Sequence, residues 1–326
     1  MNSNEDIIMS KALEEFFKDS KIPKSILDKT LDSIKKTKVN ILIVGATGAG
    51  KSSTINALFE NPVAKVGNKE PETKEIERYE VNGNLILWDS PGLGESSDAD
   101  EKHIENIRAK LNELDHNQDP LIDLVLFLID GSSRDLGSTF KLLNEVIIPS
   151  LHNETDRLIV AVNQADMAMK GHYWDKENSE PEPMLIEFLN EKIQSIKNRI
   201  KEETNIIVNP IYYSAGIDDK EINVYQKPYN LSKLLDLILD HIKSKKRAVF
   251  FEKINKNKEN FKKADSKSNY NEKIDEKINA SWFDQFIEIA KKVGVEALGY
   301  LTSKEGIEKI KIFGEIIFSK YFKNKE

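Results

Sequence analysis

The 326-residue sequence contains no cysteine, so disulfide bonds and thiol chemistry are excluded, and a reducing compartment is compatible with it. It has no apolar run near the ~20 residues that span a bilayer. Met1 opens a polar stretch that lacks the basic-then-apolar plan of a signal peptide. The five histidines show no metal-ligand spacing. We therefore expect a cytoplasmic protein with neither a transmembrane segment nor a zinc-type centre.

The chain also lacks the positive net charge that is typical of nucleic-acid-binding proteins. Its net charge of −7 argues against bulk affinity for nucleic acid, and we expect no DNA partner. The charge is unevenly spread, however, because residues 243–277 contain twelve Lys or Arg against six Asp or Glu. From about residue 247 the composition shifts to Lys, Asn and Glu, which predicts a solvated helix or linker that is at most weakly packed.

Residues 41–59, ILIVGATGAGKSSTINALF, pass from an apolar run to a helical pattern through a series of small residues. The spacing G-x-x-x-x-G-K-S is the Walker A pattern. In this pattern backbone N–H groups surround phosphate oxygens at a helix N-terminus, the lysine reaches the terminal phosphates and the serine ligates Mg²⁺. A buried strand over 39–44 and a helix over 52–59 supply the expected context. The predicted phosphate-binding residues are Gly45, Thr47, Gly48, Ala49, Gly50, Lys51, Ser52 and Ser53.

Two further segments are expected near the terminal phosphate and the metal. WDSPGLG places Asp89 at a strand end, where it would hold the Mg²⁺ shell through water, and Gly92 would offer its backbone N–H to the γ-phosphate. Residues 60–75 lack periodicity, which is typical of a mobile loop and also of a γ-phosphate-sensing switch. Such a switch supplies one threonine hydroxyl to Mg²⁺. Thr73 is the only threonine in this loop and is the predicted switch ligand.

The choice of base is predicted by two later segments, each of which follows a strand. In VNQAD, residues 162–166, the carboxylate of Asp166 can accept two hydrogen bonds from the N1–H and N2–H₂ edge of guanine, whereas adenine has no matching donor pair. Asn163 is placed to tie this loop to the Walker A loop. The nucleotide-binding set is completed by Gln164 and by the loop residues Ser214, Ala215 and Gly216, whose backbone is placed to contact the guanine O6.

With these residues in place, the sequence resembles the Era/TrmE-like GTPases, and among them the bacterial YfjP/YeeP-type GTPases. The resemblance covers roughly residues 39–246 and rests on GATGAGKSSTINALF, Thr73, WDSPGLG, DGSSRDLG, NQAD, HYWD and YNLSKLLDLI. It implies a GTP-switch domain with a Mg²⁺ site. It also implies relatives among the septin, chloroplast-import and immunity-related GTPases, several of which pair across their nucleotide faces.

The sequence departs from the family pattern in several places. Gln164 replaces the usual guanine-loop lysine, which predicts weaker nucleotide affinity without altered specificity. Leu93 stands where Ras-like enzymes keep a water-orienting glutamine, so intrinsic turnover should be slow. Gly48 stands where potassium-activated relatives carry asparagine, which argues against potassium activation. Arg134 is the best placed of the six arginines to reach across a GTP-dependent dimer, although a plain surface arginine is the alternative.

Strand and helix patterns alternate from residue 39, which predicts an α/β fold with an open, mostly parallel six-stranded sheet and helices on both faces. Asn82-Gly83 is a strong hairpin signal, so one strand should be antiparallel. A last strand is expected over 206–213, and helices over 100–114, 138–148, 184–203 and 231–246. The predicted domains are an N-terminal helical extension (1–38), a GTPase domain (39–246) and a basic linker with a C-terminal helical region (247–326).

Together these features predict a Mg²⁺-dependent GTPase that binds GTP and GDP and acts as a molecular switch, activated by nucleotide-dependent dimerisation. The predicted catalytic set is Lys51, Thr73, Gly92 and Arg134, and the predicted metal set is Ser52, Thr73 and Asp89. Two alternatives stay open. One is a GTP-dependent assembly scaffold that hydrolyses little GTP, and the other is a membrane-associated GTPase of the dynamin or immunity type. Contact of the C-terminal region with a membrane or a ribosome is likewise open.

Overall fold

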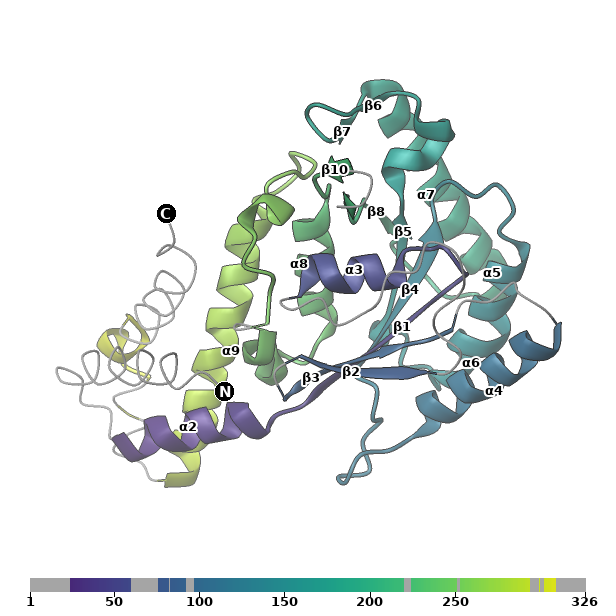
Figure 1. The fold of residues 1–326 in the computed structure, drawn as a ribbon. Coiled ribbons are helices and arrows are strands. Elements are labelled where there is room, and N and C mark those ends of the chain that lie inside the picture. The colour runs from purple at the N-terminus through teal and green to yellow at the C-terminus, as the bar shows by residue number, and fades with distance from the viewer. Residues whose placement is uncertain are drawn as a thin grey trace. The chain divides into compact units, whose positions relative to one another are not determined.

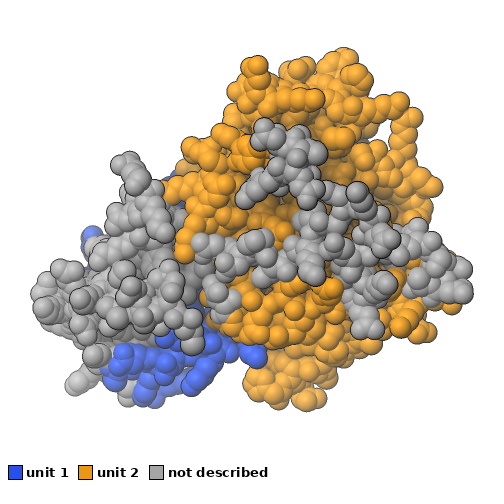
Figure 2. All heavy atoms as spheres, in the orientation of Figure 1, with its two compact units in different colours: residues 1–38, 243–252, 272–326 blue, residues 39–242, 253–271 orange. Residues whose placement is uncertain are grey.

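A computed structural model of the chain describes residues 24–59, 76–81, 83–91, 97–219, 224–250, 253–293, 299 and 302–308. The chain divides into two compact units, which Figure 2 shows in different colours. Unit 1 comprises residues 1–38, 243–252 and 272–326, and unit 2 comprises residues 39–242 and 253–271. Each unit is therefore built from segments that are separated in the sequence.

A six-stranded sheet forms the centre of unit 2, in the order β2-β3-β1-β4-β5-β8 (Figure 1). Its strands are β1 (Val39–Gly45), β2 (Glu77–Val81), β3 (Leu85–Asp89), β4 (Leu124–Asp130), β5 (Leu158–Asn163) and β8 (Ile211–Tyr212). Only the β2–β3 pair is antiparallel, and it closes through a turn in which Gly83 has φ of 90°. The predicted mostly parallel sheet with one antiparallel strand is confirmed.

Helices cover both faces of this sheet, as predicted for strands that are buried along their length. Successive side chains point to opposite faces, so Leu42, Phe127 and Val160 join the core cluster on one face, to which Ile107, Phe140 and Leu189 contribute from the helices. The helices of unit 2 are α3 (Lys51–Leu58), α4 (Ser97–Asn112), α5 (Gly137–Leu142), the π-helical η1 (Leu143–Ile147), α6 (Ile148–Ser150), η2 (Thr155–Arg157), η3 (Ala165–Gly171), α7 (Pro183–Thr204), α8 (Leu231–His241) and η5 (Lys258–Phe261).

The last strand of the sheet is shorter than the sequence indicates. Only Ile211 and Tyr212 pair with β5, whereas the expected strand over 206–213 would begin five residues earlier. Pro210 has no N–H to donate to a ladder, and Ile207 is 65% exposed. Two small hairpins were not predicted: β6 (Trp174–Asp175) with β7 (Glu180–Pro181), and β9 (Ile217–Asp219) with β10 (Val224–Gln226).

Residues 253–271, called the strap below, belong to unit 2. The interpretation of this segment as solvated and at most weakly packed was wrong. Ile254, Asn260 and Phe261 are each no more than 9% exposed, and Ile254 forms an antiparallel bridge with Phe59 at the end of α3. The polar composition gave the wrong prediction because asparagine amides of this segment donate hydrogen bonds to backbone carbonyls.

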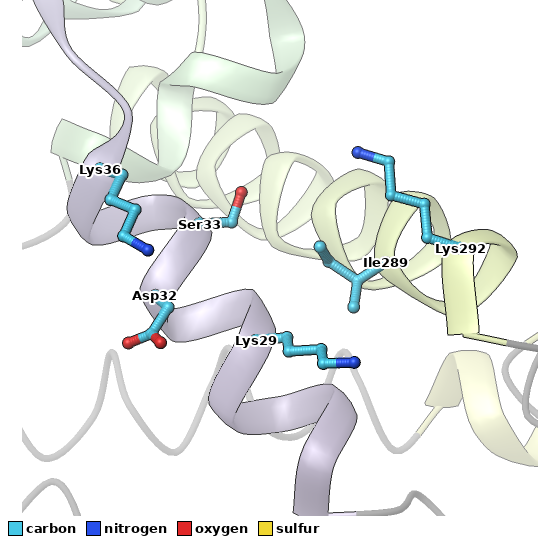
Figure 3. Close-up of a pocket in the computed structure, with 6 residues that line it drawn as sticks. All are labelled: Lys29, Asp32, Ser33, Lys36, Ile289 and Lys292. Carbon is cyan, nitrogen blue, oxygen red and sulfur yellow. The ribbon is translucent and has the colours of Figure 1, made fainter.

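Unit 1 is helical in its described part. It contains α2 (Lys24–Lys36), which begins directly after Pro23, together with η4 (Ser244–Phe250) and the portion of α9 (Tyr270–Val293) from residue 272 onward. Ser33 donates to Gln285 Oε1 at 3.0 Å, and Ser281 accepts from the Ala248 N–H at 2.9 Å. The aromatic side chains of Trp282 and Phe286 are buried. A pocket of about 390 Å³ lies between α2 and α9. Figure 3 labels the residues that line it, which are Lys29, Asp32, Ser33, Lys36, Ile289 and Lys292.

Among the residues that the structure describes, none of the helices combines the length and the apolar composition needed to cross a bilayer.

Candidate GTP-binding site

The Walker A residues form the turn between β1 and α3, at the carboxyl edge of the sheet (Figure 1). Gly48 and Gly50 have φ of 80° and 81°, a conformation that side chains disfavour. A Cβ on Gly50 would also lie 2.2 Å from Asn163 Nδ2. The glycines are therefore required by the backbone itself. The turn delivers Lys51 and Ser52 as the first residues of α3, where the N–H groups at a helix N-terminus favour anions.

Lys51 is held inside this turn. Its Nζ donates to the backbone oxygens of Gly45 at 3.2 Å and Ala46 at 3.3 Å, and the residue is 9% exposed. The ammonium is thus folded over the concave side of the loop that it belongs to. Thr47 occupies the exposed tip of the turn, and Ser53 lies half-buried in the first turn of α3. A fixed positive charge beside the backbone N–H groups of a helix N-terminus is the arrangement that a polyphosphate needs.

Ser52 and Asp89 form a second corner of the site. The register of β1 with β3 places Asp89 opposite Ile43, and the Ser52 hydroxyl donates to Asp89 Oδ2 at 3.2 Å. Asp89 is completely buried, and its Oδ1 has no hydrogen-bond partner among the described residues. Burial raises the pKa of this carboxyl to about 6, although the charge of Lys51 and the hydrogen bond from Ser52 lower it.

This corner fits a magnesium ion. A buried carboxylate with one oxygen left unpaired, beside a serine hydroxyl, offers the hard oxygen donors that Mg²⁺ prefers, and a bound cation would offset the cost of burying the charge. In the described part of the chain there is no group of three or more His, Cys, Asp or Glu side chains that could hold a metal. Mg²⁺ needs no such group, because it keeps several waters and bonds to nucleotide phosphates.

Asn163 joins the predicted phosphate end of the site to the predicted base end. Its Nδ2 donates to the Ala49 carbonyl at 3.0 Å, which is the predicted tie to the Walker A loop. Its Oδ1 accepts from the Ala215 N–H at 3.1 Å, a contact that the sequence did not indicate. Gln164 donates to the Gly48 carbonyl, so its side chain also contacts the phosphate loop. One asparagine therefore fixes the spacing of the two loops.

Asp166 and the loop 214–216 form the predicted base end. Asp166 is 5% exposed and lies at the start of η3, directly after β5. Ser214 is held by a two-way backbone bridge to Tyr229, and Gly216, with φ of 75°, donates its N–H to the Ser214 hydroxyl at 3.2 Å. A Cβ on Gly216 would lie 2.5 Å from the Gln226 carbonyl. Both predicted guanine-contacting segments thus converge beside the Walker A loop.

Arg134 lies on a loop that leaves the carboxyl end of β4 and is itself exposed. Lys192 anchors this loop, because it donates to the backbone oxygens of Gly131 at 2.6 Å and Ser133 at 2.8 Å. Burial lowers the pKa of Lys192. The arginine is therefore displayed from a fixed backbone at the same sheet edge as the Walker A loop. Sequence reasoning missed Lys192, which carries no local signal because it is one of three lysines on α7.

Three positions on which the sequence analysis relied, Thr73, Gly92 and Leu93, lie outside the described residues. Their roles stay predictions.

A buried contact that the sequence did not indicate joins α3 to the residue before Ser214. The Tyr213 hydroxyl lies 2.7 Å from Thr54 Oγ1, which also donates to the Gly50 carbonyl at 2.7 Å. Such a pairing between residues 159 positions apart is visible only in the folded chain.

Comparison with known proteins agrees with this geometry. The profile of a family described as 50S ribosome-binding GTPase matches residues 40–164, which include the Walker A loop, Asp89 and Asn163. This segment is a P-loop GTPase domain. The assignment is consistent with the sheet order, since β1, the hairpin β2–β3, β4 and β5 all fall within or overlap the matched range.

Relatives of the P-loop GTPase domain include the tRNA modification GTPase MnmE from Bacteroides thetaiotaomicron, 28% identical over 62% of this chain and 42% of that protein. The uncharacterized protein YfjP from Escherichia coli K12 is 30% identical over 39% of this chain and 41% of that protein. The chain therefore spans about two fifths of the length of these curated relatives. The predicted resemblance to YfjP-type GTPases is confirmed. Toc33 from Arabidopsis thaliana, solved with Mg²⁺ and GMPPNP, is 16% identical, covers 64% of this chain and 79% of that chain, and has a TM-score of 0.41.

Proposed function

We propose that this protein is a Mg²⁺-dependent GTPase that acts as a molecular switch. In this account Lys51 stabilises charge on the transferred phosphoryl group, and Ser52 and Thr73 hold Mg²⁺, with Asp89 holding its water shell. Gly92 donates its N–H to the γ-phosphate. Asp166 selects guanine, and Ser214, Ala215 and Gly216 present backbone groups to the base. The bound ion would neutralise phosphate charge, while the side chains named here orient the nucleotide.

The observation that carries this proposal is the pair of hydrogen bonds made by Asn163. They bring the Walker A loop and the 214–216 loop together within one side chain's reach, with Asp166 three residues further along the same loop. A phosphate site held at a fixed spacing from a carboxylate suits a guanine nucleotide, because the carboxylate can accept from the two donors on the guanine edge. Adenine has no matching pair of donors on that edge.

Phosphate release from GTP tests the enzymatic part of the proposal. The full chain should hydrolyse GTP in the presence of Mg²⁺ with an unassisted turnover on the order of 10⁻⁴ to 10⁻² per second, because Leu93 cannot orient water. Chelation of Mg²⁺ by EDTA should stop the reaction, and ATP in place of GTP should give no release above the protein-free rate. Tight GTP binding with no hydrolysis at any protein concentration would instead indicate an assembly scaffold.

We further propose that two copies of the chain pair in a GTP-dependent manner and that Arg134 acts across the dimer. An arginine supplied to a GTPase site from outside accelerates hydrolysis by roughly 10³- to 10⁵-fold in known cases. Arg134 is exposed on a loop whose backbone Lys192 pins, so it is presented without further ordering.

Specific activity should therefore rise with protein concentration, and Arg134→Ala should remove most of that rise while GDP affinity stays unchanged. Phosphate release is measured over a hundredfold range of concentration, alongside the oligomeric state from light scattering. Arg108→Ala is the matched control, because Arg108 is also exposed but lies on α4 and donates to the Glu145 carbonyl. A flat activity curve with monomers throughout would end the dimer hypothesis and leave slow monomeric hydrolysis.

A further inference from the structure

The C-terminal end of the Walker A helix α3 is completed by the strap. The last four carbonyls of a helix have no partner within it, and a short helix is sensitive to how they are satisfied. Two asparagines of the strap supply three of the donors. Asn255 donates through its backbone N–H at 2.9 Å and through Nδ2 at 3.1 Å, and Asn260 through Nδ2 at 3.1 Å. The accepting oxygens are those of Leu58, Asn56 and Ala57, respectively.

The Asn260 contact is buried, and the Asn255 side-chain contact is partly buried. Asn260 is 9% exposed, Phe261 is 8% exposed, and the bridge between Phe59 and Ile254 continues the attachment one residue beyond the helix. Phe59 is the last described residue before the segment 60–75 that the sequence predicts to be the switch. The strap therefore fixes both the end of α3 and the point from which the predicted switch departs.

The second half of the strap reaches the base end of the same site. Asn230 at the start of α8 donates its N–H to the Lys263 carbonyl at 2.8 Å and accepts from the Asp265 N–H at 2.7 Å. Its Nδ2 donates to the Tyr212 carbonyl at 3.0 Å, two residues before Ser214. An ion pair between Lys233 and Asp265, at 2.6 Å, holds this junction. One segment thus contacts the elements that support both the phosphate loop and the 214–216 loop.

From these contacts we propose that Asn255 and Asn260 are positioning residues for the nucleotide site. The helix α3 has eight residues, so its axis is about 12 Å long, and the strap holds the end opposite to Lys51 and Ser52. The direction of its N-terminal N–H groups follows from the direction of that axis, so loosening the far end misaligns the phosphate-binding end. This inference rests on the proposed binding of a guanine nucleotide.

The test compares variants of the full chain by titration with a fluorescent GDP analogue in the presence of Mg²⁺. The double variant Asn255→Ala/Asn260→Ala should bind about tenfold more weakly, since it loses two side-chain donors to carbonyls at the end of α3, one of them buried and one partly buried. In GTP hydrolysis most of the loss should appear in KM, because the backbone N–H groups at the start of α3 bind the phosphates in the ground state and in the transition state alike. Asn257→Ala is the matched control, because Asn257 is exposed on the same strap and its side chain accepts only from the Glu259 N–H within the strap.

A second variant separates positioning from simple packing. Asn260→Asp keeps the size of the side chain but turns a carboxylate toward the Ala57 carbonyl, so it should bind GDP more weakly than Asn260→Ala. If the Asn260 side chain only filled space, Asn260→Asp would bind GDP more tightly than Asn260→Ala. The unfolding temperature of each nucleotide-free variant is measured in parallel, so that GDP affinities are compared only among variants that are folded at the titration temperature. Undiminished GDP binding by the double variant overturns the inference alone, whereas absence of GDP binding by the unaltered chain overturns the proposed function as well.

Discussion

Replacement of Lys51 by alanine should reduce the affinity for Mg²⁺-bound GTP and GDP by about a hundredfold or more. Removing one partner of a buried, hydrogen-bonded charge pair typically costs about 2–5 kcal/mol, and each 1.4 kcal/mol is about tenfold in affinity. Lys51 is the ammonium that the Walker A turn folds inward, held by the Gly45 and Ala46 carbonyls. Calorimetric or fluorescence titration of the purified variant measures the loss.

The matched control is Lys201→Ala, which removes an exposed lysine from α7 in the same unit and should leave nucleotide affinity unchanged. The nucleotide-free Lys51→Ala protein should unfold within a few degrees of the unaltered chain, since the alanine leaves the turn glycines in place. Normal GDP binding by a folded Lys51→Ala variant would contradict the assignment of the β1–α3 turn as the phosphate site.

The second large effect is expected from Asp166→Asn. The proposed carboxylate accepts from two donors of guanine, so the amide should weaken GDP binding by about 30-fold or more, for a loss of roughly 2 kcal/mol or above. The same change should admit xanthosine diphosphate, whose carbonyl in place of the guanine amino group can accept from the new amide. Parallel titrations of the unaltered chain and of Asp166→Asn, each with GDP and with xanthosine diphosphate, measure this change in base preference.

Asp156→Asn is the control, because Asp156 precedes the same strand β5 that Asp166 follows, and it is exposed. Asp156→Asn should bind GDP with the affinity of the unaltered chain and should gain no affinity for xanthosine diphosphate. If Asp166→Asn weakens both nucleotides equally, the residue supports the loop without selecting the base. A loss of GDP binding with no gain of xanthosine binding would likewise remove Asp166 from the base-selecting role.

Local signals account for much of what could be predicted. The Walker A turn needs glycine at Gly48 and Gly50 for backbone reasons, so its conformation follows from a few adjacent residues. The buried strands β1, β4 and β5 are continuous apolar runs, and the turn dipeptide Asn82-Gly83 predicts the β2–β3 hairpin. The parallel sheet then necessarily gathers the residues that follow its strands at one edge, which is how Asp89 and Asn163 come to lie near Lys51.

What the sequence could not predict is long-range hydrogen bonding by residues without a distinctive pattern. Asn255 and Asn260 lie in a lysine- and asparagine-rich stretch that resembles a solvated linker, and their role depends on carbonyls about 200 positions earlier. The bond between Tyr213 and Thr54 has the same character. Composition reports average polarity, whereas an amide that caps a distant helix is polar and buried at once. Such residues are found from geometry.

An equilibrium titration of the unaltered full chain with GDP and with ADP, each in the presence of Mg²⁺, tests whether the site selects a guanine nucleotide. We predict saturable binding of GDP at one site per chain and an affinity for ADP at least about a hundredfold lower, a difference of roughly 2.7 kcal/mol. Equal affinities for GDP and ADP would contradict it, because Asp166 and the 214–216 loop would then read nothing of the base.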